Sequence, residues 1–280
     1  MSRSVPSRTP VRIVGVVNIT EDSFSDGGPY LEPEAAIAHA RGLRSDGADV
    51  VELGAASSHP DARPVSPDEE RRRLAPVLEA IAGEDIAVSV DSTQPETQRL
   101  ALAYGAAFLN DVRGFPNPAT YPTLAASDCR LVVMHSIEGR EIATRVQTDP
   151  AMIWPRVEAF FEARLAALRA GGIEHERLVV DPGLGFFLGA NPEPSVAVLS
   201  AIGRLRARFG APVLVSPSHK SFLRALTGRS VAEIGPATLA AELYAARAGV
   251  DYIRTHDVRA LSDALTVERA LHGVTSLSRQ

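Results

Sequence analysis

The stretch VRIVGVVNITEDSFSDGG (residues 11–28) joins a short apolar run to a segment rich in Asp, Ser and Gly. The same order of apolar run and polar segment recurs at intervals of about one strand plus one helix. Eight apolar runs precede such segments: 11–17, 49–53, 86–90, 107–109, 131–134, 178–180, 213–215 and 252–253. Short runs that are apolar throughout are typical of parallel strands covered on both faces. The pattern predicts eight parallel strands whose carboxyl ends carry the chemistry.

Helix-forming segments separate the apolar runs, at 34–47, 66–81, 94–104, 150–170, 193–209 and 231–248. The second begins with Ser66 before Pro67 and has Glu69 three positions on, which is the pattern of a capping box. The alternation and the length suit one (β/α)8 TIM barrel of the α/β class, whose active site lies at the carboxyl ends of the strands. We expect a single domain at 11–275 after an N-terminal extension at 1–10. A doubly wound open sheet is the alternative.

The composition restricts the classes of partner. The 280 residues include 29 Lys and Arg and 34 Asp and Glu, so no general affinity for nucleic acid or an anionic membrane is expected. Cys129 is the one cysteine, which excludes an internal disulfide, and we expect a packed thiol. Residues 1–10 lack the apolar core of a secretory signal, and no run of 18 apolar residues predicts a membrane helix. We therefore predict a cytoplasmic protein.

The first polar segment, from Asn18 to Gly28, resembles the dihydropteroate synthase pattern N-x-T-P-D-S-F-S-D-G-G, with Glu21 in place of the proline. Further matches continue in register over nearly the whole chain: Ser89-Val90-Asp91, Asn110-Asp111-Val112, Met134-His135, 181–186, Ser218-x-Lys220-Ser221 and Arg254-x-His256-Asp257-Val258. The resemblance implies a (β/α)8 barrel, commonly a homodimer, that acts in folate biosynthesis. Such enzymes join 6-hydroxymethyl-7,8-dihydropterin diphosphate to p-aminobenzoate and release pyrophosphate, with Mg²⁺ present.

Four strand-end residues fit the hydrogen-bonding edge of a pterin ring. The ring has an amide and an amino group that donate and ring nitrogens that accept, so its site needs carboxylates together with an amide or an ammonium group. The chain offers this set at four different strand ends: Asp91, Asn110, Asp181 and Lys220. The resemblance makes all four substrate-binding positions. Helix capping is the alternative role for the Asp and Asn residues.

The last strand and the first loop hold the candidate contacts for the diphosphate. Arg254 and His256 match the family's Arg-x-His and are candidate diphosphate contacts, with hydrogen bonding of His256 by Asp257 as the alternative. Asn18 matches the family's Mg²⁺-contacting asparagine, and bound substrate must supply most of the remaining oxygens. We expect His135 to be a buried, hydrogen-bonded residue. Three glycines near Asp181 are assigned a shaping role: Gly183, Gly185 and Gly189.

The second loop departs from the family pattern D-x-G-G-E-S-T-R-P-G. Ser58 stands for the threonine near the p-aminobenzoate pocket and His59 for the arginine that reaches the diphosphate, so both are candidate substrate-binding residues. Other substitutions occur in this loop and at two further motifs: Ala56, Asp61, Leu188 after Phe187, and His219. A histidine is mostly neutral at pH 7 and cannot bind phosphate through a bidentate fork. These losses predict an activity that is absent or severely weakened.

Three functions follow from these residues. The first is a pterin-binding barrel of the synthase type, a paralogue with lost or reduced activity and a binding or regulatory role. The second is an active synthase in which Arg63 or Arg113 compensates for the altered cations. The third is a barrel that presents methyltetrahydrofolate to a corrinoid partner. The match of the first loop to the synthase pattern argues against this third function. A purely structural protein has no need for four pterin-complementary residues around one opening.

Overall fold

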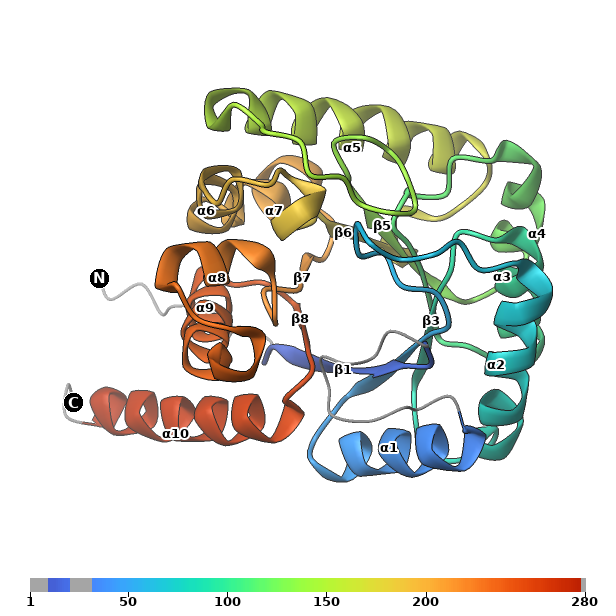
Figure 1. Cartoon of the computed structure of the whole chain (residues 1–280), viewed down its shortest axis with the longest axis horizontal. Helices are drawn as coiled ribbons and strands as arrows, with labels where there is room; N and C mark the ends of the chain where they lie inside the picture. The colour runs from blue at the N-terminus through green and yellow to red at the C-terminus, as the bar shows by residue number, and fades with distance from the viewer. Residues whose placement is uncertain (1–9, 21–31, 278–280) are drawn as a thin grey trace.

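Eight parallel strands form a ring in the computed structural model, which describes residues 10–20 and 32–277 (Figure 1). The strands are β1 (Arg12–Asn18), β2 (Val50–Gly54), β3 (Val88–Asp91), β4 (Phe108–Asp111), β5 (Arg130–Met134), β6 (Leu178–Asp181), β7 (Leu214–Val215) and β8 (Tyr252–Thr255). Their order is β6-β5-β4-β3-β2-β1-β8-β7. A parallel bridge between Val180 and Val213 joins the two outer strands, and the Val180 amide donates to the Pro212 carbonyl at 2.9 Å.

This ring confirms the predicted (β/α)8 barrel and rules out the doubly wound open sheet, because the two edge strands meet. All eight apolar runs are strands, each within a few residues of its predicted bounds. The N-terminal extension, apart from Pro10, lies outside the described residues, and so does most of the first loop, including Glu21. None of the helices in the described ranges has the length and apolar character that a membrane span requires.

The helices surround the barrel (Figure 1). They are α1 (Pro33–Ser45), α2 (Pro67–Ile81), α3 (Pro95–Ala103), α4 (Tyr121–Ala125), α5 (Ile153–Ala170), α6 (Glu193–Ser200), α7 (Gly203–Phe209), α8 (Ser221–Thr227), α9 (Gly235–Ala248) and α10 (Val258–Leu277). The predicted cap of α2 is present, since the Ser66 hydroxyl accepts from the Glu69 amide at 3.2 Å. The Glu69 carboxylate binds Arg72 and Arg73 instead of closing the box.

Two predicted helices were wrong in their extent. The segment 193–209 forms two helices, α6 and α7, because Ala201 leaves the helical region (φ −121°, ψ 24°) and Gly203 adds little helix propensity. The segment 231–248 begins with a separate 3₁₀ turn, and α9 starts only at Gly235, where Pro236 favours a first helical turn. The prediction also missed α8, whose seven residues are too few for a clear periodic pattern.

Strand alternation explains which side chains enter the barrel. One layer of side chains fills its interior: Val14, Val50, Phe108, Val132, Val179, Leu214 and Tyr252. Successive side chains on a strand point to opposite faces, so the residue two positions further on also points inward, toward the carboxyl end. On four strands, and directly after β7, that residue is polar: Glu52, Asn110, Asp181, Arg254 and Ser216. The intervening residues, such as Val51 and Ile253, pack under the helices. The polar set therefore forms the floor of the functional face.

Candidate functional site

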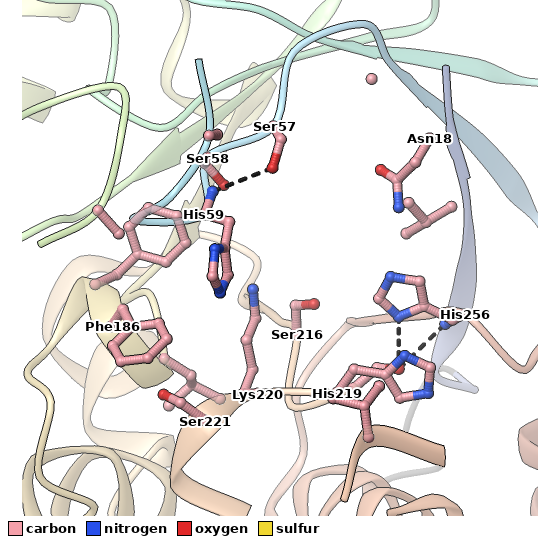
Figure 2. Close-up of a pocket in the computed structure, with 18 of the residues that line it drawn as sticks. Asn18, Ser57, Ser58, His59, Phe186, Ser216, His219, Lys220, Ser221 and His256 are labelled. Atoms are coloured by element: carbon pink, nitrogen blue, oxygen red, sulfur yellow. Dashed lines mark hydrogen bonds between the residues drawn. The ribbon is translucent and has the colours of Figure 1, made fainter. Parts of the chain in front are cut away.

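A cavity of about 810 Å³ opens at the carboxyl ends of the strands. It brings together seven of the predicted site residues: Asn18, Ser58, His59, Asp91, Lys220, Arg254 and His256. In Figure 2, Asn18, His219 and His256 lie on one side, His59, Phe186 and Ser221 lie on the other, and Lys220 projects between them. The cavity therefore has two distinct ends joined across Lys220.

The floor of the cavity is built on one buried ion pair. Arg254 Nη1 donates to Glu52 Oε1 at 2.8 Å, and its Nη2 lies 3.6 Å from Asp181 Oδ2. The side chains of Arg254 and Glu52 are only 7% and 4% exposed. The Ser89 hydroxyl donates to the second Glu52 oxygen at 3.1 Å. One cation thus balances two carboxylates and fixes their positions under the cavity.

Burial and crowding shift the charge states of the floor residues. Burial and the neighbouring Glu52 carboxylate raise the pKa of Asp91 well above its usual value. Burial also raises the pKa of Asp181, although Arg254 opposes the shift. Burial and the Arg254 charge lower the pKa of Lys220 to about 8, against the attraction of Asp181. The pKa of Arg254 lies above its usual value because the Glu52 and Asp181 charges outweigh its burial. Arg254 is thus the fixed charge of the floor, while Lys220 can change charge near neutral pH.

Asn110 and Asp181 are below the cavity surface and are not among its lining residues. Asn110 is 0% exposed and Asp181 is 1% exposed. Neither polar atom of the Asn110 side chain has a hydrogen-bond partner in the described parts of the chain, and the same holds for Asp181 Oδ2. Buried polar groups in native proteins are nearly always paired, so an unpaired set under a cavity indicates a polar ligand. Of the four residues predicted to bind a pterin, Asp91 and Lys220 thus line the cavity, whereas Asn110 and Asp181 are buried beneath its lining.

Two histidines mark the end of the cavity near Asn18. The His256 amide donates to the Ser218 hydroxyl at 3.2 Å, and His256 Nδ1 is 2.8 Å from the same oxygen. The His219 ring stacks on the His256 ring, with centroids 4.5 Å apart and planes 7° apart. Asp257 accepts from the Ala260 amide at the start of α10, so it caps that helix, while the Ser218 hydroxyl contacts the His256 ring. The alternative in which Asp257 holds His256 stays a prediction.

The opposite rim is made by three loops. The Ala143 amide donates to the Ser58 carbonyl at 3.0 Å, which joins the loop after β5 to the loop after β2. Arg145 forms a bidentate ion pair with Asp61, in which one bond is 2.7 Å. His59 is half exposed and meets the Phe186 ring edge-on at 5.8 Å. The family's arginine position is therefore occupied by a histidine, and the adjacent Asp61 is paired with a different arginine, Arg145.

The glycine-rich loop after β6 has a backbone role, as predicted. Gly183 and Gly185 have φ values of +71° and +66°, and a Cβ at Gly183 would lie 2.5 Å from the His135 carbonyl oxygen. His135 is 2% exposed and its Nδ1 is 3.0 Å from the Pro182 carbonyl. Burial lowers the pKa of His135 to about 4, and burial raises the pKa of the packed Cys129 thiol to about 12. Both predictions of buried structural roles are confirmed.

Several residues lie at places that the sequence analysis did not predict. Leu188 is fully buried in the outer core, so it does not face the cavity. Neither Arg63 nor Arg113, the proposed compensating cations, is among the residues that line the cavity. The sequence analysis missed Glu52 and Arg224. The spacing of two between the core residue Val50 and Glu52 could have revealed the first, whereas Arg224 belongs to a helix that was not predicted.

A divalent metal ion would have few protein ligands in this cavity. Asn18 ends β1 and lines the cavity with its neutral amide side chain. Within the described ranges, no three His, Cys, Asp or Glu side chains are grouped as a metal site requires. Mg²⁺ commonly takes one or two protein oxygens and completes its octahedron with water and phosphate. The residues therefore fit an ion that enters with a phosphorylated substrate and do not fit a resident metal.

Comparison with known proteins assigns the class that this fold and site define. The family model described as "Pterin binding enzyme" matches residues 14–256. The chain belongs to this family, and within it to the dihydropteroate synthases. It is 58% identical to "Dihydropteroate synthase type-2" of Escherichia coli, with 92% of this chain and 95% of that protein covered. It is 48% identical to "Dihydropteroate synthase type-3" of the same organism, over 93% of this chain and 99% of that protein.

Solved structures support the same assignment. A Xanthomonas albilineans dihydropteroate synthase with 4-aminobenzoic acid superposes with a TM-score of 0.84 at 37% identity, with 94% of this chain and 93% of that chain covered. The structure of the X. albilineans enzyme in complex with 7,8-dihydropteroate gives a TM-score of 0.81 at 35% identity, with 94% of each chain covered. The resemblance inferred from the sequence motifs is thus confirmed as family membership.

Proposed function

We propose that this chain is an active dihydropteroate synthase. The observation that carries the proposal is the buried polar set of the floor, in which Asn110 and Asp181 have atoms without a hydrogen-bond partner in the described residues, beneath a cavity lined by Asp91 and Lys220. This set complements a ring with adjacent donors and acceptors. The names of relatives at 48–58% identity support the synthase over the methyl-transferring alternative. The reaction joins the aromatic amine nitrogen of p-aminobenzoate to the pterin methylene carbon, while the carbon–oxygen bond to diphosphate breaks.

The floor residues hold the pterin in this proposal. Asp181 and Asp91 accept hydrogen bonds from the ring amide and amino groups, and the Asn110 amide and the Lys220 ammonium group serve the ring nitrogens and the carbonyl oxygen. Arg254 keeps the carboxylates of Glu52 and Asp181 in place through its contacts with both side chains. A ring seated on this floor is excluded from water on one face. Its methylene group then points toward the centre of the cavity, where the bond exchange takes place.

The end of the cavity with the two histidines receives the diphosphate. The Ser218 hydroxyl accepts from the His256 amide, so its own proton is available to His256 Nδ1. With Nδ1 as the acceptor, Nε2 of His256 carries the ring proton and serves as a donor to an anion. Lys220 adds a positive charge between the two ends. Together these groups stabilise the negative charge that develops on the leaving diphosphate, where an electrostatic contact has its largest effect on rate.

Mg²⁺ is proposed to enter with the diphosphate, with Asn18 as its protein ligand. When bound, the ion would neutralise part of the charge on the leaving group. His59 lies at the other end, beside Phe186, so we do not assign it to the diphosphate.

The predicted loss of activity depended on three positions where the family has a cation and this chain has His59, Leu188 or His219. The residues that line the cavity weaken that argument. Leu188 is in the core, so no charge is lost from the cavity wall there. Three cations still line the cavity: Lys220, Arg224 and Arg254. His219 packs on His256 and so supports a second donor. We therefore favour the active enzyme over the inactive paralogue.

A turnover assay tests this proposal directly. Purified protein, pterin diphosphate, p-aminobenzoate and Mg²⁺ should release pyrophosphate in a coupled assay, with formation of 7,8-dihydropteroate. Asn110→Leu should abolish binding of the pterin diphosphate in calorimetry, whereas Asn117→Leu, on the barrel exterior, should bind as the wild type does. Tight binding without release of pyrophosphate would support the inactive paralogue. Absence of binding would overturn the pterin site.

We also propose that the protein acts in the cytoplasm as a homodimer. Three large apolar side chains are exposed on adjacent helices: Val196 on α6, Leu226 on α8 and Tyr244 on α9. The Tyr244 hydroxyl donates to the Ser200 carbonyl at 3.2 Å, so α9 and α6 are neighbours. Exposed apolar groups gathered on one face commonly mark a protein interface. Sedimentation velocity should give a dimer for the wild type and a monomer for Leu226→Glu. A wild-type monomer at micromolar concentration would contradict the proposal.

A further inference from the structure

The strand ends that carry Asp91 and Asn110 are joined to each other behind the cavity. The two residues are register partners at the end of the β3–β4 pairing, and the Ser92 amide donates to the Asn110 carbonyl at 3.0 Å. The polar atoms of the Asn110 side chain have no hydrogen-bond partner within residues 10–20 and 32–277. The positions of Asp91 and Asn110 therefore depend on what holds the residues that follow them, which are Ser92 and Asp111.

Gln98 on α3 links these two following residues. Its Nε2 atom donates to the Ser92 carbonyl at 2.9 Å and lies 3.3 Å from Asp111 Oδ2, to which it also donates. Both partners are acceptors, so the nitrogen of the amide and not its oxygen must face them. Gln98 is 4% exposed and Asp111 is 1% exposed, so water cannot take the place of a lost donor without cost. One side chain thus connects β3 to β4 one residue beyond their last register pair.

Ser92 is a fixed anchor for this link. Its hydroxyl donates to Glu70 Oε2 at 2.5 Å and accepts from the Gln94 amide at 3.0 Å. Glu70 belongs to α2 and is fully buried, so that helix also holds the end of β3. The anchor is therefore shared by α2 and by the start of α3.

Asp111 is held from its own loop and from Gln98. Its Oδ1 accepts from the Arg113 amide at 2.8 Å, whereas its Oδ2 accepts from Gln98. Burial raises the pKa of Asp111 to about 6, and the hydrogen bonds from the Arg113 amide and from Gln98 oppose this shift. Gln98 thus stabilises a buried carboxylate while it ties the end of β4 to the anchor at Ser92.

We propose that Gln98 is a positioning residue that sets the separation of Asp91 and Asn110, and with it the affinity of the site for the pterin ring. This inference rests on the proposed synthase function, and Gln98 lies outside the family motifs quoted above. Gln98 is not among the residues that line the cavity, so it acts through its neighbours and not through a contact with substrate. A ring with fixed donors and acceptors binds most tightly when its partners already have the matching geometry.

Gln98→Met tests this role, because it removes both donated bonds and keeps a side chain of similar length. Calorimetry with the pterin diphosphate should give a Kd about 3- to 10-fold above that of the wild type, the range expected when neutral hydrogen bonds to the ring are weakened. KM for the pterin diphosphate should rise by a similar factor, whereas KM for p-aminobenzoate and kcat should each change by less than about twofold. A partly folded variant would instead lose kcat and keep both KM values, so the two causes are distinguishable.

Gln94→Met is the matched control. It makes the same substitution four residues earlier, at the start of the same helix, where the Gln94 side chain makes no capping hydrogen bond. Its Kd and both KM values should equal those of the wild type. An increase in Kd like that of Gln98→Met would overturn the specific role of Gln98.

A double variant separates position from charge. Adding Asp111→Asn to Gln98→Met removes the buried charge that has lost its donor, so the melting temperature should return toward that of the wild type while Kd stays high. Recovery of Kd in the double variant, or a wild-type Kd for Gln98→Met alone, would overturn the positioning role. Absence of pterin diphosphate binding by the wild-type protein would instead overturn the proposed function, and this inference with it.

Discussion

The cavity has an arginine–carboxylate pair at its floor and another at its rim, and the two differ in their surroundings. The Arg254–Glu52 pair is 7% and 4% exposed, whereas the Arg145–Asp61 pair is 51% and 64% exposed. A buried pair cannot lose one partner without leaving an uncompensated charge, but water replaces a lost partner at the surface. The floor pair therefore fixes one arrangement of the site, while the rim pair can exchange partners at little cost.

The largest expected effect comes from breaking the floor pair. Arg254→Met leaves Glu52 and Asp181 buried without their cation. The free energy of unfolding should fall by about 3 kcal/mol, because the carboxylates must either stay charged or take up protons. Turnover should fall by at least about 100-fold, since the pterin ring loses its fixed floor. Urea denaturation and the pyrophosphate-release assay measure the two quantities.

A double variant separates these two effects. Adding Glu52→Gln to Arg254→Met removes one of the unpaired charges, so part of the lost stability should return while turnover stays low. If Arg254→Met unfolds at the same urea concentration as the wild type, the floor pair does not hold the site in the way described. If the double variant regains turnover, Arg254 acts on stability alone.

The next effect concerns Lys220, which connects the floor to the histidine end. Burial and the Arg254 charge lower the pKa of Lys220 to about 8. Raising the pH through this value removes the positive charge, so kcat/KM for the pterin diphosphate should fall above pH 8 with a single ionisation. Lys220→Arg should keep its charge to about pH 10, because a guanidinium group does not lose its proton in this range. Matching pH profiles for both proteins would show that another group causes the decline.

The floor could be predicted from the sequence because strand geometry places it. Asp91, Asn110 and Asp181 follow apolar runs, and a parallel barrel brings all such positions to one end. Alternation also fixes which of them point inward, and the same rule applied to Val50 would have included Glu52. The unusual residues of the floor were thus readable from spacing alone.

The rim could not be predicted, because its contacts join segments that are far apart in the chain. Arg145 reaches Asp61 across 84 positions, and no periodic pattern connects the two. Leu188 was counted among the positions where the site had lost a cation, yet the turn at Gly185 to Phe187 directs it into the core. Arg224 was overlooked since its helix is too short to give a signal. Such contacts depend on loop conformation and not on the strand register.

A buried carboxyl group outside the cavity tests how much the absence of a neighbouring cation costs in stability. Glu242 on α9 is 2% exposed, and burial raises its pKa to about 8 from an ordinary value of 4.5. The folded state therefore binds the proton more tightly, so this contribution is fully present below pH 4.5 and is lost as the pH rises through 8. At pH 9, the free energy of unfolding of Glu242→Gln should exceed that of the wild type by several kcal/mol, and at pH 4.5 the two free energies should agree. Glu79→Gln, at an exposed helix position, should match the wild type at both values.

The smallest expected effect comes from breaking the rim pair. The size of this effect tests the comparison between the floor pair and the rim pair. Asp61→Asn frees Arg145 from its exposed partner while the loop contact between Ala143 and Ser58 remains. Exposed pairs contribute little, so the melting temperature should not change measurably and KM for either substrate should change by less than about threefold. Arg145→Gln should behave in the same way, and the double variant should equal either single one. A change in KM comparable to that of the floor variants would mean that Arg145 contacts the substrate, and would replace a passive rim with a second cationic binding group.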